Sequence, residues 1–118
     1  MAKRKKIISL RPALAGIRDI VRSEQHARIH LLIAIIVLTL SRLLGFSFFE
    51  SLFLVTAIGF VFLAEIVNTL IEYMADFIEP NHKEVIRKIK DMAAGMVLTM
   101  SFFAICIAIL IVLGHYHR

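Results

Sequence analysis

Four polar side chains recur at helical spacing within a stretch that is otherwise apolar. Glu65, Asn68, Glu72 and Asp76 follow one another at steps of three and four residues. At about 100° per residue, the four share a stripe about 80° wide that extends roughly 16 Å along a helix. Carboxylates in such a stripe suit hard cations such as Mg²⁺, and an amide can orient a hydroxyl group. A polar seam between helices is the alternative, although Asn and Thr would form one at a lower cost than three acids.

Two further charged positions are expected at the same depth as this stripe. Glu24 precedes the first long apolar run, and Lys90 and Asp91 precede the last one. They add carboxylates for a divalent cation and an ammonium group for phosphates, so the whole set suits magnesium and a nucleotide. The sequence has no GxxxxGKS or GxxxxGKT loop, which excludes a soluble P-loop kinase, and no HExxH or CxxC pattern for zinc.

The composition is that of a membrane protein. The chain has 118 residues, enough for one domain, and 59% of them are hydrophobic. Its mean hydropathy is +0.83, and a soluble protein of this size could not bury so much apolar surface. We therefore expect an all-α integral membrane protein. Cys106 is the single cysteine, so no intrachain disulfide is possible.

An amphipathic helix followed by three membrane spans must position these residues. Apolar residues recur at steps of three and four within residues 7–26, with arginines beside them, which predicts a helix lying in the headgroup plane. Packing of this helix against another part of the protein is the alternative. Pro12 is tolerated only in its first turn. The spans are predicted at about residues 28–49, 51–74 and 92–114.

The polar segments outside these spans are predicted to lie in water. Residues 76–90 carry most of the remaining charge around Pro80 and are expected to form a loop or a helix extension. His115 and His117 are expected in a hydrated tail. Ser9 is a candidate cap for the first helix.

Basic residues indicate how the chain is oriented. Eight Lys and Arg lie between Lys3 and Arg28 and four within residues 83–90, which makes twelve of the fourteen. The positive-inside rule then predicts a multi-pass protein of the cell membrane with a cytoplasmic N-terminus. The basic cluster at Lys3–Lys6 is expected to bind acidic lipid headgroups. No nucleic-acid partner is expected, because no recognition motif accompanies the positive charge.

One region of the chain resembles a known family. AEIVNTLIEYMADFIEPNHKEVIRKIKDMAAGMVL, residues 64–98, is similar to the signature region of the small prokaryotic diacylglycerol kinases, whose Gram-positive branch phosphorylates undecaprenol. The pattern is AExxNTxIExxxD, followed fourteen residues after the Asp by KD and small residues. Ala13 and Gly16 in AxxG, Glu24, and RIH at Arg28–His30 also fit, so the resemblance extends over nearly the whole chain.

The resemblance implies a lipid kinase that uses ATP and Mg²⁺. The reaction would convert diacylglycerol to phosphatidic acid, or undecaprenol to undecaprenyl phosphate. Glu65 would be the general base that takes the proton of the lipid hydroxyl. Glu24 and Glu72 would hold magnesium that bridges the ATP phosphates.

The resemblance also implies how the nucleotide is held and how the chains assemble. Lys90 and Asp91 would contact the nucleotide, with Asn68 and Asp76 supporting the site. The protein would be a homotrimer of three-span protomers whose active sites are shared between neighbours. Departures from the family pattern fall at Pro12, at His26 and within residues 81–83.

Two points stay open at the level of sequence. The substrate is either diacylglycerol or undecaprenol, and KDMAAG at residues 90–95 slightly favours the Gram-positive branch. The alternative function is a non-enzymatic membrane protein that uses the acidic stripe for proton or cation passage. Such a channel would need polar residues reaching the outer side, yet the third span has no charged side chain before His115.

Overall fold

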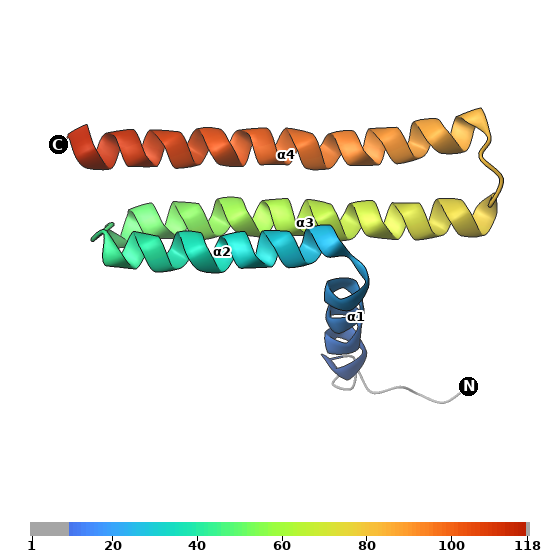
Figure 1. The fold of residues 1–118 in the computed structure, drawn as a ribbon, viewed down its shortest axis with the longest axis horizontal. Coiled ribbons are helices and arrows are strands. Elements are labelled where there is room, and N and C mark those ends of the chain that lie inside the picture. Colours follow the sequence, from blue (N-terminus) through green and yellow to red (C-terminus); the bar gives the residue numbers. More distant parts are fainter. Residues whose placement is uncertain (1–9, 118) are drawn as a thin grey trace.

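Three long helices lie side by side in the computed structural model, which describes residues 10–117 (Figure 1). The helices are α1 (Leu10–Ser23), α2 (Gln25–Leu43), α3 (Phe48–Ile78) and α4 (Glu84–His117). Consecutive helices α2, α3 and α4 run antiparallel, and α1 leaves the bundle crosswise. All secondary structure within residues 10–117 is helical, which confirms the all-α prediction for that part of the chain.

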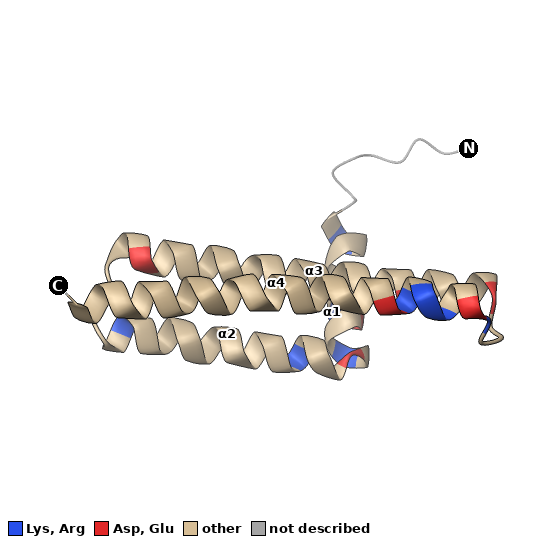
Figure 2. Cartoon of the chain, turned by 90° about the horizontal axis from the view of Figure 1, so that it is seen from above, with Lys and Arg blue, Asp and Glu red and all other residues tan. Residues whose placement is uncertain are grey.

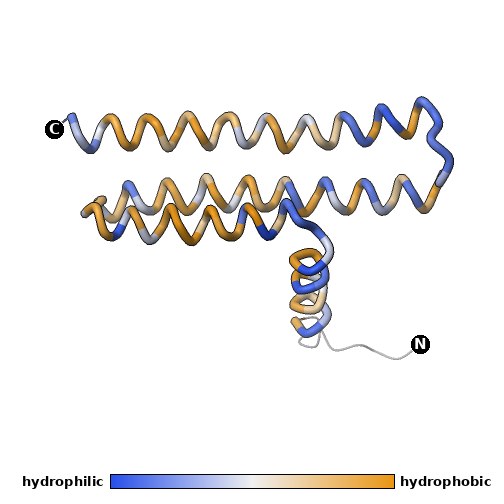
Figure 3. The backbone as a smooth tube through the Cα atoms, in the orientation of Figure 1, coloured by the Kyte–Doolittle hydropathy of each residue, from blue (hydrophilic) through white to orange (hydrophobic). Residues whose placement is uncertain are grey.

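The three bundle helices are long and apolar enough to cross a membrane, as predicted. Figure 3 shows α4 as hydrophobic along most of its length and hydrophilic near Glu84. The charged residues of α4 gather at the same end, while its middle carries none (Figure 2). We refer to this end of the bundle, where α3 finishes and α4 begins, as the acidic end.

The helix bounds differ from the predicted spans by three to eight residues, and the largest differences lie at the two connections between the bundle helices. α2 ends at Leu43, six residues before the predicted end of the first span, because a tight turn follows. α3 continues to Ile78, and α4 already begins at Glu84. Most of the polar segment 76–90 is therefore a helix extension, and only residues 79–83 connect the two helices.

The turn between α2 and α3 is determined by local chemistry. Gly45 adopts a φ of 77°, a left-handed conformation that residues with a side chain rarely take. Ser47 then caps α3 in a capping box: its Oγ accepts from Glu50 N at 3.1 Å, and Glu50 Oε1 accepts from Ser47 N at 2.7 Å. These bonds set the start of α3.

The same turn is joined to the end of α4. His115 Nδ1 lies 3.0 Å from Glu50 Oε1, and the His115 ring stacks on Phe46 with centroids 4.3 Å apart. Glu50 is only 8% exposed. The prediction that His115 lies in a hydrated tail is therefore wrong, since it is half-buried in α4; His117, also in α4, is exposed. The signal that was missed is Glu50, an acid that needs a partner at this end.

α3 is the central helix of the bundle, and small residues allow its neighbours to approach it closely. Its buried residues include Ala57, Ala64 and Ala75, and Ala27 of α2 and Ala93 of α4 are buried as well. Most large apolar side chains of the bundle are exposed, among them Leu63, Leu70 and Met74 on the face of α3 opposite the acids. So much exposed apolar surface is expected to contact lipid or neighbouring chains.

Within the segment predicted as an amphipathic helix, residues 7–26, α1 covers Leu10–Ser23, and Pro12 lies in its first turn. Residues 25 and 26 belong to α2 instead. The apolar α1 residues Leu10, Leu14 and Ile17 are exposed, at 66%, 58% and 47%. The placement of α1 in the headgroup plane stays a prediction. The proposed cap Ser9 and the basic cluster Lys3–Lys6 lie outside the described residues.

The hydrogen bond between His115 and Glu50 at the turn leads to a prediction about stability. Replacing His115 with Ala should lower the free energy of unfolding by about 1–3 kcal/mol, because a hydrogen bond to a buried carboxylate is lost. Thermal unfolding of the purified protein in detergent measures this change. The matched control is His117→Ala, at an exposed position in the same turn. Equal unfolding midpoints for the two variants would show that the pair contributes nothing.

Candidate active site

α3 runs without a break through all four residues of the predicted stripe, so they share one face of the helix. Burial decreases along this face toward the acidic end: Glu65 is 6% exposed, Asn68 and Glu72 are half-buried, and Asp76 is exposed. The face therefore passes from the interior of the bundle into an open environment. One helix thus provides polar groups in both surroundings.

Glu65, the most buried of these acids, has a partner on α2. His30 Nε2 lies 2.9 Å from Glu65 Oε2, and the side chains are 25% and 8% exposed respectively. The Glu65 main-chain carbonyl accepts from Thr69 Oγ1 at 3.0 Å, one turn further on. The pair connects α2 to α3 and leaves the second carboxylate oxygen, Oε1, for another partner.

Asn68 presents an acceptor that the protein leaves open. Its Nδ2 donates to Glu72 Oε2 at 3.4 Å. Its Oδ1 is buried and has no hydrogen-bond partner among the described residues. A buried acceptor without a partner costs about 1–3 kcal/mol. A hydroxyl group or a bound cation placed between Glu65 and Glu72 would satisfy it.

Glu24 lies at the elbow between α1 and α2, and neighbouring contacts hold this elbow. Arg28 Nη1 donates to the carbonyls of Val21 and Arg22 at 2.9 and 2.7 Å, at the end of α1. Tyr73 on α3 lies within hydrogen-bond distance of Ser23, at 3.4 Å. Glu24 occupies the N-cap position of α2, but its side chain makes no capping hydrogen bond.

The level of Glu24 along α3 follows from the two contacts on either side of it. α2 runs antiparallel to α3, and His30 pairs with Glu65 while Ser23 pairs with Tyr73. Glu24 is next to Ser23, so it lies at the level of Glu72, which is next to Tyr73. The structure thus brings the predicted magnesium ligands to one height in the bundle.

The predicted nucleotide contacts lie in the first turns of α4. Lys90 bonds Asp76 across the two helices. Asp91 accepts from Arg87 Nη1 at 2.7 Å, and Arg87 also bonds Glu84. Lys90 and Asp91 are therefore at the acidic end, beside the stripe, and both are engaged in ion pairs.

The carboxylate and amide oxygens of the candidate site suit a magnesium ion that is bound together with substrate phosphates. They do not form a site in which protein side chains alone hold a metal. Within residues 10–117, no three acids, histidines or cysteines lie close enough to hold a metal ion. Mg²⁺ is commonly bound by one or two carboxylates together with substrate phosphates and water. Glu24, at the start of α2, and Glu72, on the same face of α3 as the unpaired Asn68 oxygen, suit that mode of binding. Their assignment to magnesium stays a prediction.

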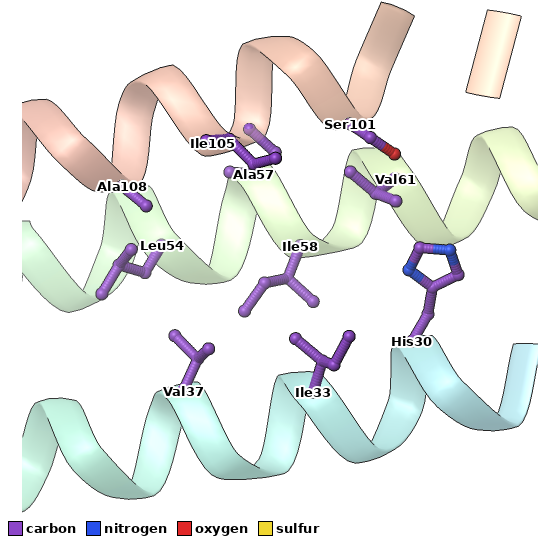
Figure 4. Close-up of a pocket in the computed structure, with 11 residues that line it drawn as sticks. His30, Ile33, Val37, Leu54, Ala57, Ile58, Val61, Ser101, Ile105 and Ala108 are labelled. Atoms are coloured by element: carbon purple, nitrogen blue, oxygen red, sulfur yellow. The ribbon is translucent and has the colours of Figure 1, made fainter. Parts of the chain in front are cut away.

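An apolar cavity of about 260 Å³ begins beside His30 and extends away from the acidic end (Figure 4). Figure 4 shows Ile33 and Val37 pointing from α2 toward α3, with His30 at one end of the row. The lining residues, from α2, α3 and α4, are His30, Ile33, Val37, Leu54, Ala57, Ile58, Val61, Ser101, Ala104, Ile105 and Ala108. A hydrocarbon chain fits such a lining, and its polar end would meet the His30–Glu65 pair.

Comparison with known sequences decides the family. The model of the family described as prokaryotic diacylglycerol kinase matches residues 11–112. This chain is a member of that family. The resemblance found in the sequence is thereby confirmed. The chain is also 33% identical, over 98 residues, to the undecaprenol kinase of Bacillus subtilis (strain 168), covering 83% of this chain and 80% of the relative.

The sequence predicted the acids of this candidate site but not the contacts between helices that accompany them, His30 with Glu65 and Tyr73 with Ser23. His30 entered only as part of the RIH motif, without a role, and Tyr73 was not noticed. Both contacts depend on the register between α2 and α3, which no local pattern states. The spacing between Glu24 and His30 was the available signal. Because α2 runs antiparallel to α3, a residue that follows Glu24 on α2 lies closer to Glu65 than to Glu72.

Proposed function

We propose that this member of the family transfers the γ-phosphoryl group of ATP to the hydroxyl of a membrane lipid alcohol. The observation that carries the proposal is the position of Glu65. This buried carboxylate pairs with His30 at the end of the apolar cavity and begins the polar face that leads to Asp76. The site therefore connects a place for hydrocarbon with a place for a hydrated, charged substrate.

The gradient of burial along α3 matches the two substrates. A lipid alcohol presents its hydroxyl at the membrane boundary, whereas ATP stays in water. In the cell membrane, with the N-terminus and the acidic end in the cytoplasm, Glu65 would meet the hydroxyl and Glu72 the phosphates. Seven residues separate them, roughly 10 Å along the helix at 1.5 Å per residue.

The residues of α3 then have distinct tasks. Oε1 of Glu65 accepts the hydroxyl proton, and the Asn68 side chain orients the hydroxyl through its open oxygen. The lipid oxygen bonds to the γ-phosphorus, the bond from that phosphorus to the bridging oxygen breaks, and ADP leaves with the electron pair. Such transfer depends mainly on positioning and on neutralising charge.

The charges at the acidic end would hold the nucleotide. Magnesium, when bound, neutralises charge on the β- and γ-phosphates. Glu24 and Glu72 are the side chains we assign to holding it. Lys90 would exchange its bond with Asp76 for a phosphate oxygen, and Asp91 would contact the nucleotide beside it.

Undecaprenol is the first candidate for the lipid, and diacylglycerol is the second. The Bacillus subtilis relative is named an undecaprenol kinase, whereas the family description names diacylglycerol. The cavity lining contains no charged group and includes Ala57, Ala104 and Ala108, which leave room for part of a hydrocarbon chain. The rest of a long chain would extend into the bilayer.

The observations favour a kinase over proton or cation passage. A conducting path would need polar groups between Glu65 and Glu50, the next acid along α3. Instead the cavity between these levels is lined by aliphatic side chains, with His30 and Ser101 as its polar members. An ion would lose hydration there without gaining ligands.

The assembly we propose is a homotrimer with active sites shared between chains. One protomer leaves Glu72 half-buried, Asp76 exposed and much of its apolar surface uncovered. Carboxylates near the membrane boundary, such as these two, must face protein or water rather than lipid chains. A neighbouring chain would cover the acidic face and complete the site.

The direct test is phosphorylation of both lipids by the purified protein. Undecaprenol and diacylglycerol are presented side by side in mixed micelles with γ-labelled ATP and Mg²⁺, and labelled lipid is counted. Transfer that is faster to undecaprenol is the expected result. Transfer only to diacylglycerol would reverse the order of substrates, and transfer to neither would refute the proposed function.

Magnesium dependence tests the two proposed ligands. Glu24→Ala and Glu72→Ala should each raise the Mg²⁺ concentration needed for half-maximal activity. The double variant should lose less than the product of the single losses, because ligands of one ion act as a unit. Titration of activity against Mg²⁺ measures all three. Losses that multiply independently would place the two acids in separate sites.

Subunit mixing tests the shared site. Glu65→Gln and Glu24→Ala are coexpressed with different affinity tags, purified through both, and assayed at a low Mg²⁺ concentration at which each variant alone is expected to be nearly inactive. Recovery of activity is expected, because a mixed trimer would contain sites with both wild-type residues. Mixed oligomers that form but stay inactive would show that each protomer builds its own site.

A further inference from the structure

His30 is the strongest feature of the site that has no assigned role. Its Nε2 lies 2.9 Å from Glu65 Oε2 and is, within residues 10–117, the only hydrogen-bond partner of that carboxylate. The ring also lines the apolar cavity, so it stands where the hydrocarbon space meets the buried acid (Figure 4). Ala27, one turn before it on α2, is 1% exposed, which shows that α2 is packed tightly at this level.

The simpler explanation of the contact is that His30 is a core residue that needs a polar partner. That explanation does not account for the burial of Glu65, whose side chain is only 8% exposed. An ionised carboxylate so placed is costly unless a donor faces it. Removing the acid would free His30 at little cost, whereas removing His30 would leave Glu65 buried without a donor. The pair therefore serves the carboxylate more than the imidazole.

We propose that His30 is a positioning residue for the phosphoryl transfer: its Nε2–H donates to Glu65 Oε2 and thereby orients Oε1 toward the lipid hydroxyl. The inference rests on the proposed function, since it assigns Glu65 to proton acceptance. A base whose partner holds it in one rotamer needs no reorientation at the moment of reaction.

During the step His30 neither gains nor loses a proton. The hydroxyl proton passes to Glu65 Oε1 as the lipid oxygen bonds to phosphorus and ADP departs. Glu65 is then neutral, and its bond with His30 weakens because the acceptor has lost its charge. Release of the proton to water along the Asn68–Asp76 face restores the pair.

Two substitutions separate positioning from packing. His30→Gln places an amide N–H near the position of Nε2, whereas His30→Leu fills the apolar space but has no donor. We expect His30→Leu to lower kcat by about 10- to 100-fold with KM for ATP and lipid nearly unchanged, because misplacement of a reacting group costs up to about that much. His30→Gln should recover most of kcat. Ile36→Leu, on the same helix but exposed and outside the cavity lining, is the control and should keep wild-type kcat.

The wild-type protein, assayed beside the variants, separates failure of the His30 proposal from failure of the proposed function. If the wild-type protein transfers phosphate and His30→Leu is as active as the control, His30 has no positioning role. If His30→Gln and His30→Leu lose kcat equally while staying folded, the donor is not what matters, and the proposal is overturned. If the wild-type protein transfers no phosphate, the proposed function itself fails.

A measurement on the unmodified histidine covers the case in which a variant does not fold. In the wild-type protein labelled with ¹⁵N-histidine, NMR should show the His30 proton on Nε2, and Glu65→Gln should shift that resonance. A proton on Nδ1 instead, or an Nε2 resonance that ignores Glu65→Gln, would contradict a donor bond to the carboxylate.

Discussion

The need to cover a carboxylate inside an apolar bundle organises this protein. Glu65 lies on a helix long and apolar enough to cross a membrane, and it is nearly buried. Its partner His30 comes from a different helix, so the pair also fixes how α2 lies against α3. The cavity, the open Asn68 oxygen and the level of Glu24 are all placed relative to this contact.

The same solution appears at the other end of α3. Glu50 is buried near the start of the helix and pairs with His115 from the end of α4, as Glu65 pairs with His30 from α2. Each buried acid of α3 thus fixes a different neighbour. Between the two pairs the packing is aliphatic and leaves a cavity, whereas beyond Glu65 the helix face becomes polar. Two acid–histidine pairs therefore mark the limits of the apolar part of α3, beyond which its face becomes polar.

Features that depend on residues close together in the sequence could be predicted. The acidic stripe follows from helical periodicity, and the continuous helix α3 from Phe48 to Ile78 places its four residues on one face. The three apolar helices follow from composition, and the structure contains them. Helix ends were harder, because the turn at Gly45 is marked by single residues within an apolar run. Partners were hardest: His30 and His115 meet acids 35 and 65 residues away. Such contacts depend on the register between helices, which local spacing leaves undetermined.

In the proposed mechanism, Glu65 takes the proton of a lipid alcohol while the nucleotide binds further along the same helix. The most direct measurement compares wild-type protein with Glu65→Gln, for lipid phosphorylation by γ-labelled ATP and for ATP binding at equilibrium. The amide keeps the size of the side chain but cannot accept the proton. Turnover should fall by about 10²- to 10⁴-fold with ATP affinity nearly unchanged. Near-normal turnover by Glu65→Gln would contradict the account.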